Sequence, residues 1–154
     1  MKRDVLLVPM GEEHLDAVAS LEARCFSQPW SRASLESELS NPTARFFVCL
    51  ADGKTVGHAG MHAVCGEGYV ANIAVEPELR GRGLGRALLE RLLTCAREEG
   101  LAFLTLEVRP SNRAAVALYE SEGFRKAGVR RGFYDAPKED ALLMTRYLDT
   151  AESV

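Results

Sequence analysis

The sequence lacks any long apolar run. None approaches the roughly 18 consecutive apolar residues of a membrane-spanning helix, and the N-terminal stretch has neither the apolar segment nor the small-residue cleavage site of a signal peptide. The net charge of −3 also gives no overall attraction to nucleic acid or anionic membranes, which are themselves negative. We therefore expect a cytoplasmic protein without nucleic acid or membrane partners, in which any anion is held by a local site.

Paired cysteines and clustered metal ligands are scarce as well. The four cysteines show no C-x-x-C spacing, so we expect free, mostly buried thiols in preference to disulfide bridges. His58 and His62 lie in an expected strand, where four residues span roughly 13 Å, too far for one metal ion. No Ser-His-Asp or Cys-His arrangement is evident. We therefore expect no metal.

The length of 154 residues is typical of one domain, and the sequence patterns predict regular helices and strands along it. The patterns predict strands at 4–10, 45–51, 55–65, 69–75, 102–108, 124–131 and 141–147, and helices at 15–26, 31–39, 84–99 and 113–122. A loop is expected at 132–140, and the last residues, from Asp149, are expected to be frayed. One parallel crossover through the long helix makes the sheet mixed, so we expect a single α+β domain over residues 1–154.

The stretch from Tyr69 to Gly100 predicts a strand, a glycine-rich turn and a long amphipathic helix. The sequence R-G-R-G-L-G at residues 80–85 lets the backbone bend sharply and a ligand approach it closely. It is neither a Rossmann fingerprint nor a P-loop, because the required acidic residue and G-K-[ST] are missing. A helix that begins at glycines and is surrounded by three arginines offers N–H groups and positive charge to a phosphate or pyrophosphate.

Three further side chains have both a structural and a functional interpretation. Glu107 shares a strand face with Arg109, where it is either a solvated or ion-paired strand end or a catalytic base. Tyr119, on the following helix, is either a core tyrosine with its hydroxyl at the rim or a catalytic group. Trp30, in the Pro-Trp turn between the first two helices, either fills the core or lines a substrate pocket. The residue pattern alone leaves these alternatives open.

A family resemblance is carried by several motifs together. The strand N-I-A-V at residues 72–75, the R-x-x-G-x-G turn with its helix, the strand L-E-V-R and the run A-x-x-L-Y-x-x-x-G-F at 115–124 resemble GNAT N-acetyltransferases. The segments at 26–31, 106–112 and 130–144 further resemble the RimI family of ribosomal-protein alanine N-acetyltransferases. This similarity implies a GNAT fold, with a mixed, mostly antiparallel sheet of about seven strands flanked by about four helices.

The resemblance also implies roles for individual residues. Glu107 matches the general base and Tyr119 the general acid that protonates the departing CoA thiolate. Asn112 is expected to cap its helix and to contact the cofactor. The remaining contacts to acetyl-CoA are expected from the backbone of Ile73, Ala74 and Val75 for the pantetheine arm, and from Gly81, Arg82, Gly83, Leu84, Gly85 and Arg86 for the pyrophosphate.

By the same resemblance the acceptor is a protein N-terminus, with the terminal alanine of small-subunit ribosomal protein eighteen as the leading candidate. Trp30 and Tyr134 are expected to contact it. Related enzymes often carry two tyrosines before the last strand, whereas this chain has Phe133 and Tyr134, so its pocket is expected to accept a different set of N-termini. Two alternatives stay open: acetylation of lysine side chains or a small-molecule amine, and a non-catalytic acyl-CoA-binding regulatory module.

Overall fold

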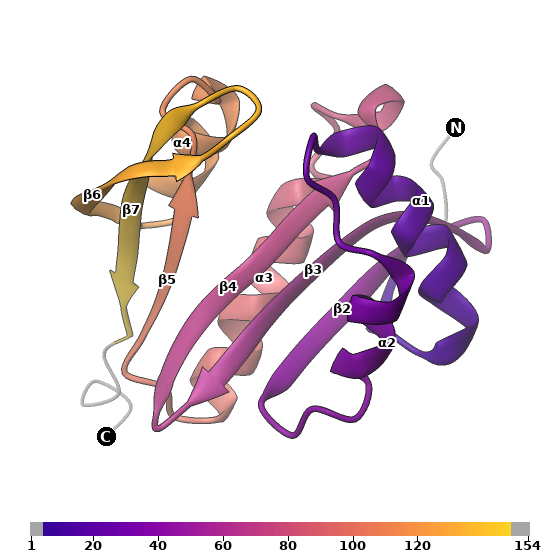
Figure 1. The fold of residues 1–154 in the computed structure, drawn as a ribbon. Coiled ribbons are helices and arrows are strands. Elements are labelled where there is room, and N and C mark those ends of the chain that lie inside the picture. Colours follow the sequence, from indigo (N-terminus) through magenta and orange to yellow (C-terminus); the bar gives the residue numbers. More distant parts are fainter. Residues whose placement is uncertain (1–4, 149–154) are drawn as a thin grey trace. The chain divides into compact units, whose positions relative to one another are not determined.

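The computed structural model describes residues 5–148. The strands are β1 (Val5–Pro9), β2 (Ala44–Ala51), β3 (Lys54–Val64), β4 (Glu67–Val75), β5 (Phe103–Val108), β6 (Arg125–Tyr134) and β7 (Glu139–Tyr147); Figure 1 labels β2 to β7. The helices are α1 (Leu15–Cys25), α2 (Arg32–Glu38), α3 (Leu84–Glu98) and α4 (Arg113–Ser121), with short 3-10 turns η1 (Glu12–His14) and η2 (Pro77–Leu79). The predicted fraying from Asp149 onward lies outside the described residues.

Two compact units make up the chain. Unit 1 contains the residues up to His62 together with Ala71–Cys95, and unit 2 contains Ala63–Val70 together with the residues from Ala96 onward. Strand β4 and helix α3 therefore contribute residues to both units. The assignment of residues 1–154 to a single domain stays a prediction.

The strands form one mixed, seven-stranded sheet in the order β1-β2-β3-β4-β5-β7-β6. Strand β4 pairs with β5 in parallel at Gly68 and Tyr69, whereas the β1–β2, β2–β3, β5–β7 and β6–β7 pairs are antiparallel. Pro9 lies in an edge strand, where its missing N–H costs no ladder hydrogen bond. The predicted α+β class with a mixed, mostly antiparallel sheet is confirmed.

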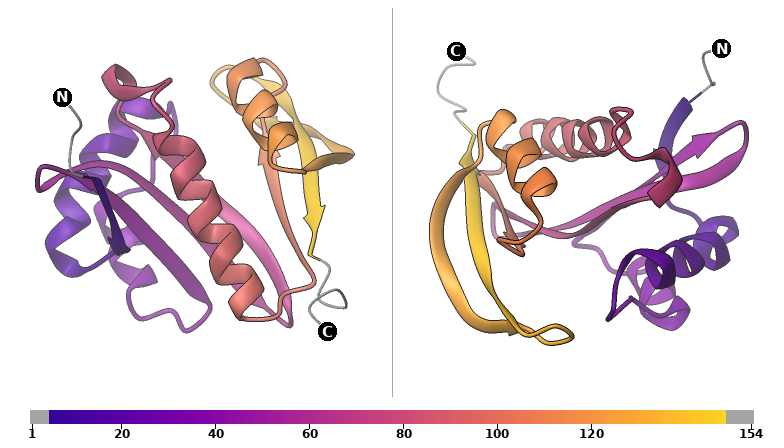
Figure 2. Two further views of the ribbon diagram at one scale, coloured as in Figure 1. Left: turned by 180° about the vertical axis from the view of Figure 1, so that it is seen from behind. Right: turned by 90° about the horizontal axis from the view of Figure 1, so that it is seen from above.

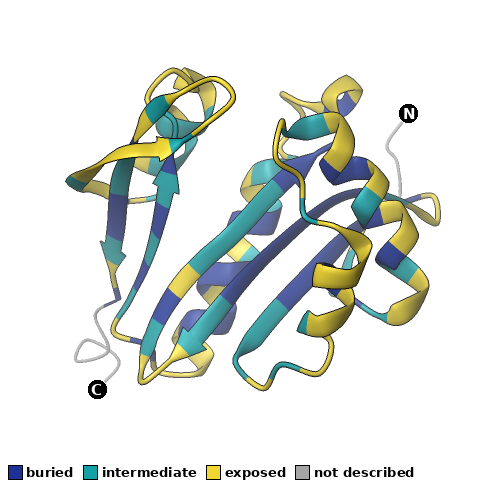
Figure 3. Cartoon of the chain, viewed as in Figure 1, coloured by how far each residue is buried: buried dark blue, intermediate teal, exposed yellow. Residues whose placement is uncertain are grey.

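In unit 1 the helices cover both faces of the strands, with α1 and α2 on one side and α3 on the other (Figure 2). Successive residues of a strand point to opposite faces. Accordingly, Phe46 and Val48 of β2 join a buried cluster with residues of α1 and α2, whereas Phe47 lies under the guanidinium of Arg91 in α3, at 4.3 Å. The predicted apolar stripe of α3 is buried at Leu88, Leu89, Leu92, Leu93 and Ala96 (Figure 3).

Tight turns join the three strands of the predicted meander. Asp52 and Gly53, which connect β2 to β3, both have positive φ angles, of 51° and 81°. Cys65 and Gly66, which connect β3 to β4, repeat this conformation with φ angles of 51° and 78°. Two consecutive residues in the left-handed region are typical of a type I′ turn, whose twist matches that of the flanking strands.

The second of these turns differs from the prediction. The strands predicted at 55–65 and 69–75 left Gly66–Gly68 as the turn between them, but β4 already begins at Glu67 and Gly68 is a buried strand residue. A Cβ on Gly68 would lie 2.9 Å from the Cδ1 atom of Leu104. Close packing of the parallel strand, and not a turn conformation, therefore explains this glycine.

The last hairpin, in unit 2, also differs from the prediction. The expected loop at 132–140 is shorter, because β6 continues to Tyr134, which pairs with Glu139 at the start of β7. The register shifts between Arg130 and Tyr134, and Gly132 within this irregularity has a φ angle of 62°. The irregularity absorbs the extra residues and lets the pairing resume, so Tyr134 is held in a strand end.

The predicted cap of α4 by Asn112 is confirmed, and two further helix ends are capped in the structure. The side chains of Ser31 and Asn112 each accept a hydrogen bond from the backbone N–H three residues later, at 3.1 and 3.2 Å. Gly100 follows α3 with a φ angle of 68°, and the N–H of Leu101 returns to the carbonyl of Ala96 at 3.0 Å. Within residues 5–148 no helix has the length and apolar character needed to cross a membrane.

Candidate active site

Glu107 is a half-buried carboxylate near the end of β5. Residues of this strand alternate between buried and half-buried, so Glu107 lies on the face opposite Leu106 and Val108, as the sequence predicted. Arg109, the ion-pair partner considered from the sequence, contacts other groups. Its Nη1 donates to the carbonyl of Pro137 at 2.7 Å and to Oε1 of Glu139 at 3.3 Å.

Tyr134, the last residue of β6, shares the electrostatic surroundings of Glu107. Burial, followed by the negative charge of Glu107, raises the pKa of Tyr134 to about 12. The guanidinium of Arg109 lies 4.3 Å from the centre of the Tyr134 ring, and the ring of Phe133 meets it edge-on at 4.9 Å. The contact with Arg109, which lies two residues after Glu107 in the chain, places Tyr134 at the end of β5.

Tyr119 joins the same group from α4. Its ring tilts against Phe124 with a centroid distance of 5.9 Å. Burial, and then the neighbouring Tyr134, raises the pKa of Tyr119 to about 12. The hydroxyl therefore keeps its proton at neutral pH, as a proton donor must. Unit 2 thus brings a carboxylate, Glu107, together with two protonated phenols.

A second carboxylate ties the end of β5 to the start of β7. Oε2 of Glu139 accepts the N–H of Ser111 at 2.9 Å, and Oε1 accepts the Ser111 hydroxyl at 2.8 Å. The hydrogen bond from the Ser111 hydroxyl is the largest of the influences that lower the pKa of Glu139. No pattern in the sequence indicated this contact, because the two residues are 28 positions apart.

In unit 1 the glycine-rich turn opens directly into α3, as predicted. Gly81 and Gly83 have φ angles of 79° and 84°, and no heavy atom lies within 4 Å of the position a Cβ would take on either. The first N–H groups of α3, from Leu84, have no partner inside the helix. A left-handed, exposed backbone with open space in front of a helix start fits a pyrophosphate.

The strand that leads into this turn is anchored at its last residue. The carbonyl of Val75 accepts Nε of Arg80 at 3.3 Å and lies 3.5 Å from the Cys25 thiol. Ala74 and Val75 are buried, and Ile73 is half-buried. The predicted pantetheine strand is therefore connected to the predicted pyrophosphate turn through η2 and through this hydrogen bond of Arg80.

The partly buried ring of Trp30 packs against the core, and its backbone N–H takes part in a buried hydrogen-bond network. The ring packs against Phe46 at 5.7 Å, as the structural interpretation of Trp30 expected. Its N–H donates to Oε1 of Glu22 at 2.9 Å. Oε2 of Glu22 lies 2.7 Å from Nε2 of His58 and accepts Nδ2 of Asn72 at 2.7 Å. Sequence reasoning did not find this network.

The two histidines that were weighed as metal ligands face different carboxylates. Nε2 of His62 lies 2.6 Å from Oε2 of Glu38, whereas His58 faces Glu22. No group of three or more potential metal ligands occurs among the residues that the structure describes. None of the four cysteines forms a disulfide, and Cys49 and Cys95 are buried.

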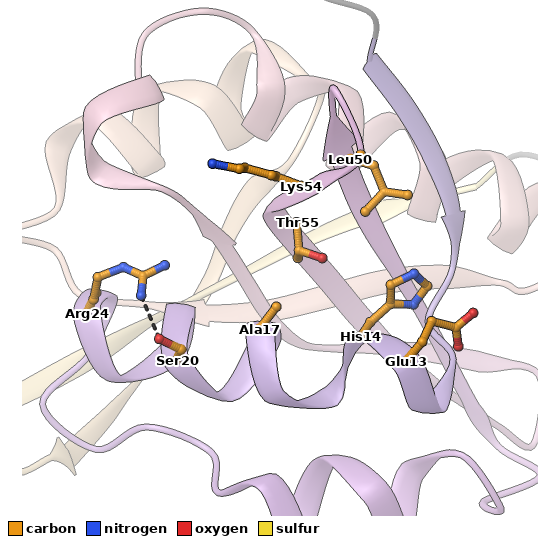
Figure 4. A pocket seen from close by; sticks show the side chains of 9 residues that line it. Glu13, His14, Ala17, Ser20, Arg24, Leu50, Lys54 and Thr55 are labelled. Carbon is orange, nitrogen blue, oxygen red and sulfur yellow. Dashed lines mark hydrogen bonds between the residues drawn. The ribbon is translucent and has the colours of Figure 1, made fainter.

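A hollow of about 520 Å³ lies elsewhere in unit 1, beside α1 (Figure 4). Its lining includes Arg24, Ser20 and Lys54 and none of the predicted site residues. Arg24 donates to the Ser20 hydroxyl at 2.7 Å and pairs with Glu76 at 2.6 Å. The protein itself satisfies this guanidinium, and we assign no ligand to the hollow.

Comparison with known proteins extends the geometric result. The model of the acetyltransferase (GNAT) family matches residues 15–124. The ribosomal protein bS18-alanine N-acetyltransferase of Escherichia coli is 42% identical over 134 residues, which are 84% of this chain and 88% of that protein. The N-alpha-acetyltransferase RimI of Mycobacterium tuberculosis is 40% identical over 134 residues, 83% of each chain.

A solved structure agrees with these sequence matches. The crystal structure of the Escherichia coli ribosomal-protein-alanine N-acetyltransferase superposes with a TM-score of 0.89 at 36% identity and covers 96% of both chains. Family model, sequence relatives and structure therefore agree over most of the chain. The chain belongs to the GNAT family of acetyltransferases, among the ribosomal-protein alanine N-acetyltransferases.

Proposed function

We propose that this protein transfers the acetyl group of acetyl-CoA to the α-amino group of a protein N-terminus, and that its acceptor is the N-terminal alanine of ribosomal protein bS18. GNAT acetyltransferases use acetyl-CoA. The observation that carries the proposal is the grouping of Glu107 with the protonated Tyr134 and Tyr119 in unit 2. A ribosomal acceptor places the reaction in the cytoplasm.

Unit 1 supplies the proposed contacts to acetyl-CoA. Residues from Gly81 to Arg86 would surround the pyrophosphate, because the two left-handed glycines leave the backbone open and α3 begins there. The backbone of Ile73, Ala74 and Val75 would bind the pantetheine arm in the manner of an added strand. Asn112 of unit 2, which caps α4, would contribute a further contact to the cofactor. No metal takes part in this scheme.

Glu107 is the proposed general base. An α-amino group has a pKa of about 7.7 to 8.0, so most of it is protonated near pH 7 but the proton is held weakly. A carboxylate, acting directly or through one water, therefore needs only modest help to generate the neutral nucleophile. The neutral nitrogen then attacks the thioester carbonyl, and an N–H near Ile73–Val75 would stabilise the oxygen charge that develops.

Tyr119 is the proposed general acid. The new carbon–nitrogen bond forms as the carbon–sulfur bond breaks, and the electron pair of that bond leaves with the CoA sulfur. The phenol of Tyr119, protonated because burial raises its pKa to about 12, donates a proton to the thiolate. The proton that Glu107 removed passes to solvent, and the nitrogen loses a second proton after the attack, which replaces the proton of Tyr119 through solvent. The products are the N-acetyl peptide, free CoA and one proton.

The acceptor side is proposed to involve Trp30 and Tyr134. The hydroxyl of Tyr134 would hydrogen-bond the backbone of the incoming N-terminus beside Glu107. Phe133 lies against Tyr134 and carries no hydroxyl, so the second donor found in related enzymes is replaced by an apolar surface. We therefore expect a preference for small, uncharged N-terminal residues.

Release of free CoA tests this proposal directly. Enzyme, acetyl-CoA and an alanine-starting peptide of the bS18 N-terminus are mixed, and thiol is measured with a chromogenic disulfide. We expect turnover by the wild type and a loss of at least about 100-fold in Glu107→Gln, as for removal of a general base. Equal rates for the two proteins, or tight acetyl-CoA binding without turnover on any amine, would contradict the proposed function.

The identity of the acceptor is tested by competition and in cells. Peptides with a free α-amine, peptides with only a lysine amine, and polyamines compete for one limiting amount of enzyme. We expect only the α-amine peptides to be acetylated. Mass spectrometry of N-termini from cells with and without the protein should then show one ribosomal protein that loses its acetyl group.

A further inference from the structure

Glu22 is a fully buried carboxylate that the mechanism above does not use. Its side chain, on the inner side of α1, is 0% exposed. Its two oxygens meet polar atoms of Trp30, His58 and Asn72, at 2.9, 2.7 and 2.7 Å. A buried carboxylate is costly unless hydrogen bonds replace its hydration, and here each bond reaches a different segment of unit 1.

The three partners do not depend on Glu22 equally. His58 and Asn72 lie inside β3 and β4, whose backbones the sheet holds in place. Trp30 lies in the segment between α1 and α2, which belongs to neither a helix nor a strand. At its two ends, Phe26 donates to the carbonyl of Glu22 and Leu35 donates to that of Ser31. The bond from Trp30 to the Glu22 carboxylate fixes the segment at one further point, just before Ser31.

We propose that Glu22 is a positioning residue for the acceptor. Its carboxylate holds the backbone of Trp30 at a fixed place relative to Asn72, the residue that directly precedes Ile73–Val75. The segment that meets the incoming N-terminus is thereby set against the strand that binds the cofactor. This inference rests on the proposed function, because it takes Trp30 to contact the acceptor.

A glutamine at this position cannot make the same three bonds, because an amide has one oxygen where a carboxylate has two. If the amide oxygen faces Trp30, its NH₂ group faces the NH₂ group of Asn72. If the oxygen faces Asn72 and His58, the NH₂ group faces the N–H of Trp30. Two donors oppose each other in either orientation, so Glu22→Gln specifically disturbs the network at nearly constant side-chain volume.

Trp30 is the only tryptophan of the chain, so its fluorescence reports on this segment without reference to activity. We expect acrylamide to quench Glu22→Gln at least about twofold more efficiently than the wild type, because loss of the bond frees the segment. Glu38→Gln is the matched control, since Glu38 also faces a histidine, His62, at 2.6 Å. Its quenching should equal that of the wild type. Wild-type quenching in folded Glu22→Gln would overturn the proposal.

Kinetics separate positioning from general destabilisation. In Glu22→Gln we expect the KM for the alanine-starting peptide to rise about tenfold, which corresponds to one lost hydrogen bond to a charged group. The Kd for acetyl-CoA, measured by calorimetry, should stay within about threefold, because the sheet still holds β4. A lower melting temperature with both constants unchanged would show a structural role only and would contradict the proposal. Absence of wild-type turnover would refute the proposed function, whereas the fluorescence would still decide the role of Glu22.

Two further measurements apply if Glu22→Gln does not fold. Glu22→Asp keeps the charge but is one methylene shorter. Its carboxylate can bond either the backbone of Trp30 or the side chains of His58 and Asn72, but not all three, so it should show the same increase in quenching. In the wild type, the Trp30 amide should exchange its hydrogen at least about 100-fold more slowly than an open loop, as a buried bonded amide does. Exchange at the rate of an open loop would overturn the inference without any variant.

Discussion

The guanidinium of Arg109 lies over the ring of Tyr134, 4.3 Å from its centre, and donates to the carbonyl of Pro137 at 2.7 Å. One side chain that follows β5 thus contacts the β6–β7 hairpin both at the end of β6 and within its turn. Because Glu107 lies two residues before Arg109, the hairpin is held next to the proposed base. The position of Tyr134 depends on a planar cation at position 109.

Arg109→Lys tests this dependence. Lysine carries a point charge that does not stack flat on an aromatic ring, and it has fewer donors. The interaction that holds Tyr134 in place should therefore weaken by about 1 kcal/mol. We expect the KM for the acceptor peptide to rise about fivefold with little change in the Kd for acetyl-CoA. Arg32→Lys, which alters the surface pair of Arg32 with Asp16 at 2.6 Å, should leave both constants unchanged. An unaltered KM in Arg109→Lys would contradict the role of Arg109.

Glu107→Gln should change a titration as well as the rate. The negative charge of Glu107 raises the pKa of Tyr134, so its removal should lower that pKa below about 12. The measurement is NMR of ring-labelled tyrosine from pH 8 to 12. Glu120→Gln, on the exposed side of α4, is the control and should leave the titration of Tyr134 where it was. If Tyr134 titrates identically in Glu107→Gln, the two side chains do not share one environment.

Alkaline stability should report on Tyr119. Its pKa is about 12 in the folded protein and about 10 in an unfolded chain. The folded state therefore keeps a proton that the unfolded state releases, so the stabilisation is complete below pH 10 and is lost as the pH rises to 12. In Tyr119→Phe the free energy of unfolding in urea should fall less steeply over this interval. The control is Tyr147→Phe, at a residue that is 76% exposed. Parallel curves for wild type and Tyr119→Phe would disprove the assignment.

Gly83 and Gly128 form a matched pair for the pyrophosphate turn. Neither has a heavy atom within 4 Å of the position that an alanine methyl group would take, but only Gly83 has a left-handed backbone, with a φ angle of 84°. An L-residue in that conformation costs about 1–2 kcal/mol. Gly83→Ala should therefore raise the Kd for acetyl-CoA about tenfold by calorimetry, and Gly128→Ala should not. Equal Kd values of the two variants for acetyl-CoA would show that this turn does not contribute to the cofactor site.

Asn112→Ala should destabilise the helix that carries Tyr119. The lost bond from the N–H of Ala115, at 3.2 Å, corresponds to about 1 kcal/mol for an N-cap. Urea unfolding measures this difference, and Asn112→Ser, which keeps a capping oxygen, should recover most of it. A stability loss of the same size in both variants would mean that the cap is not the cause.

Features that depend on adjacent residues were predictable from the sequence. The cap of α4 at Asn112 and the end of α3 at Gly100 each follow from one residue type at one position. The outward face of Glu107 follows from strand alternation alone. The pyrophosphate turn could be located because its glycines adjoin the helix start in sequence.

Features that depend on distant residues were not predictable in this way. Glu22 lies 36 residues from His58 and 50 from Asn72, and its place in α1 looks like any charged helix position. The two misplaced strand ends have a related cause. Gly68 and Gly132 were both interpreted as turn residues, whereas one allows close packing and the other lies in an irregular strand. A sequence shows that a glycine is present but not which of these uses it has.

The passage from α3 into β5 contains no spare length. After the cap at Gly100, the N–H of Ala102 bonds the carbonyl of Gly66 at 2.8 Å, and the carbonyl of Ala102 accepts the N–H of Leu148 at 2.9 Å. One residue added or removed here would turn every following side chain of β5 to the other face, so that Glu107 would enter the core. The number of residues between Gly100 and β5 thus determines on which face of the strand Glu107 lies. We therefore expect insertions in this enzyme to be tolerated only outside this connection.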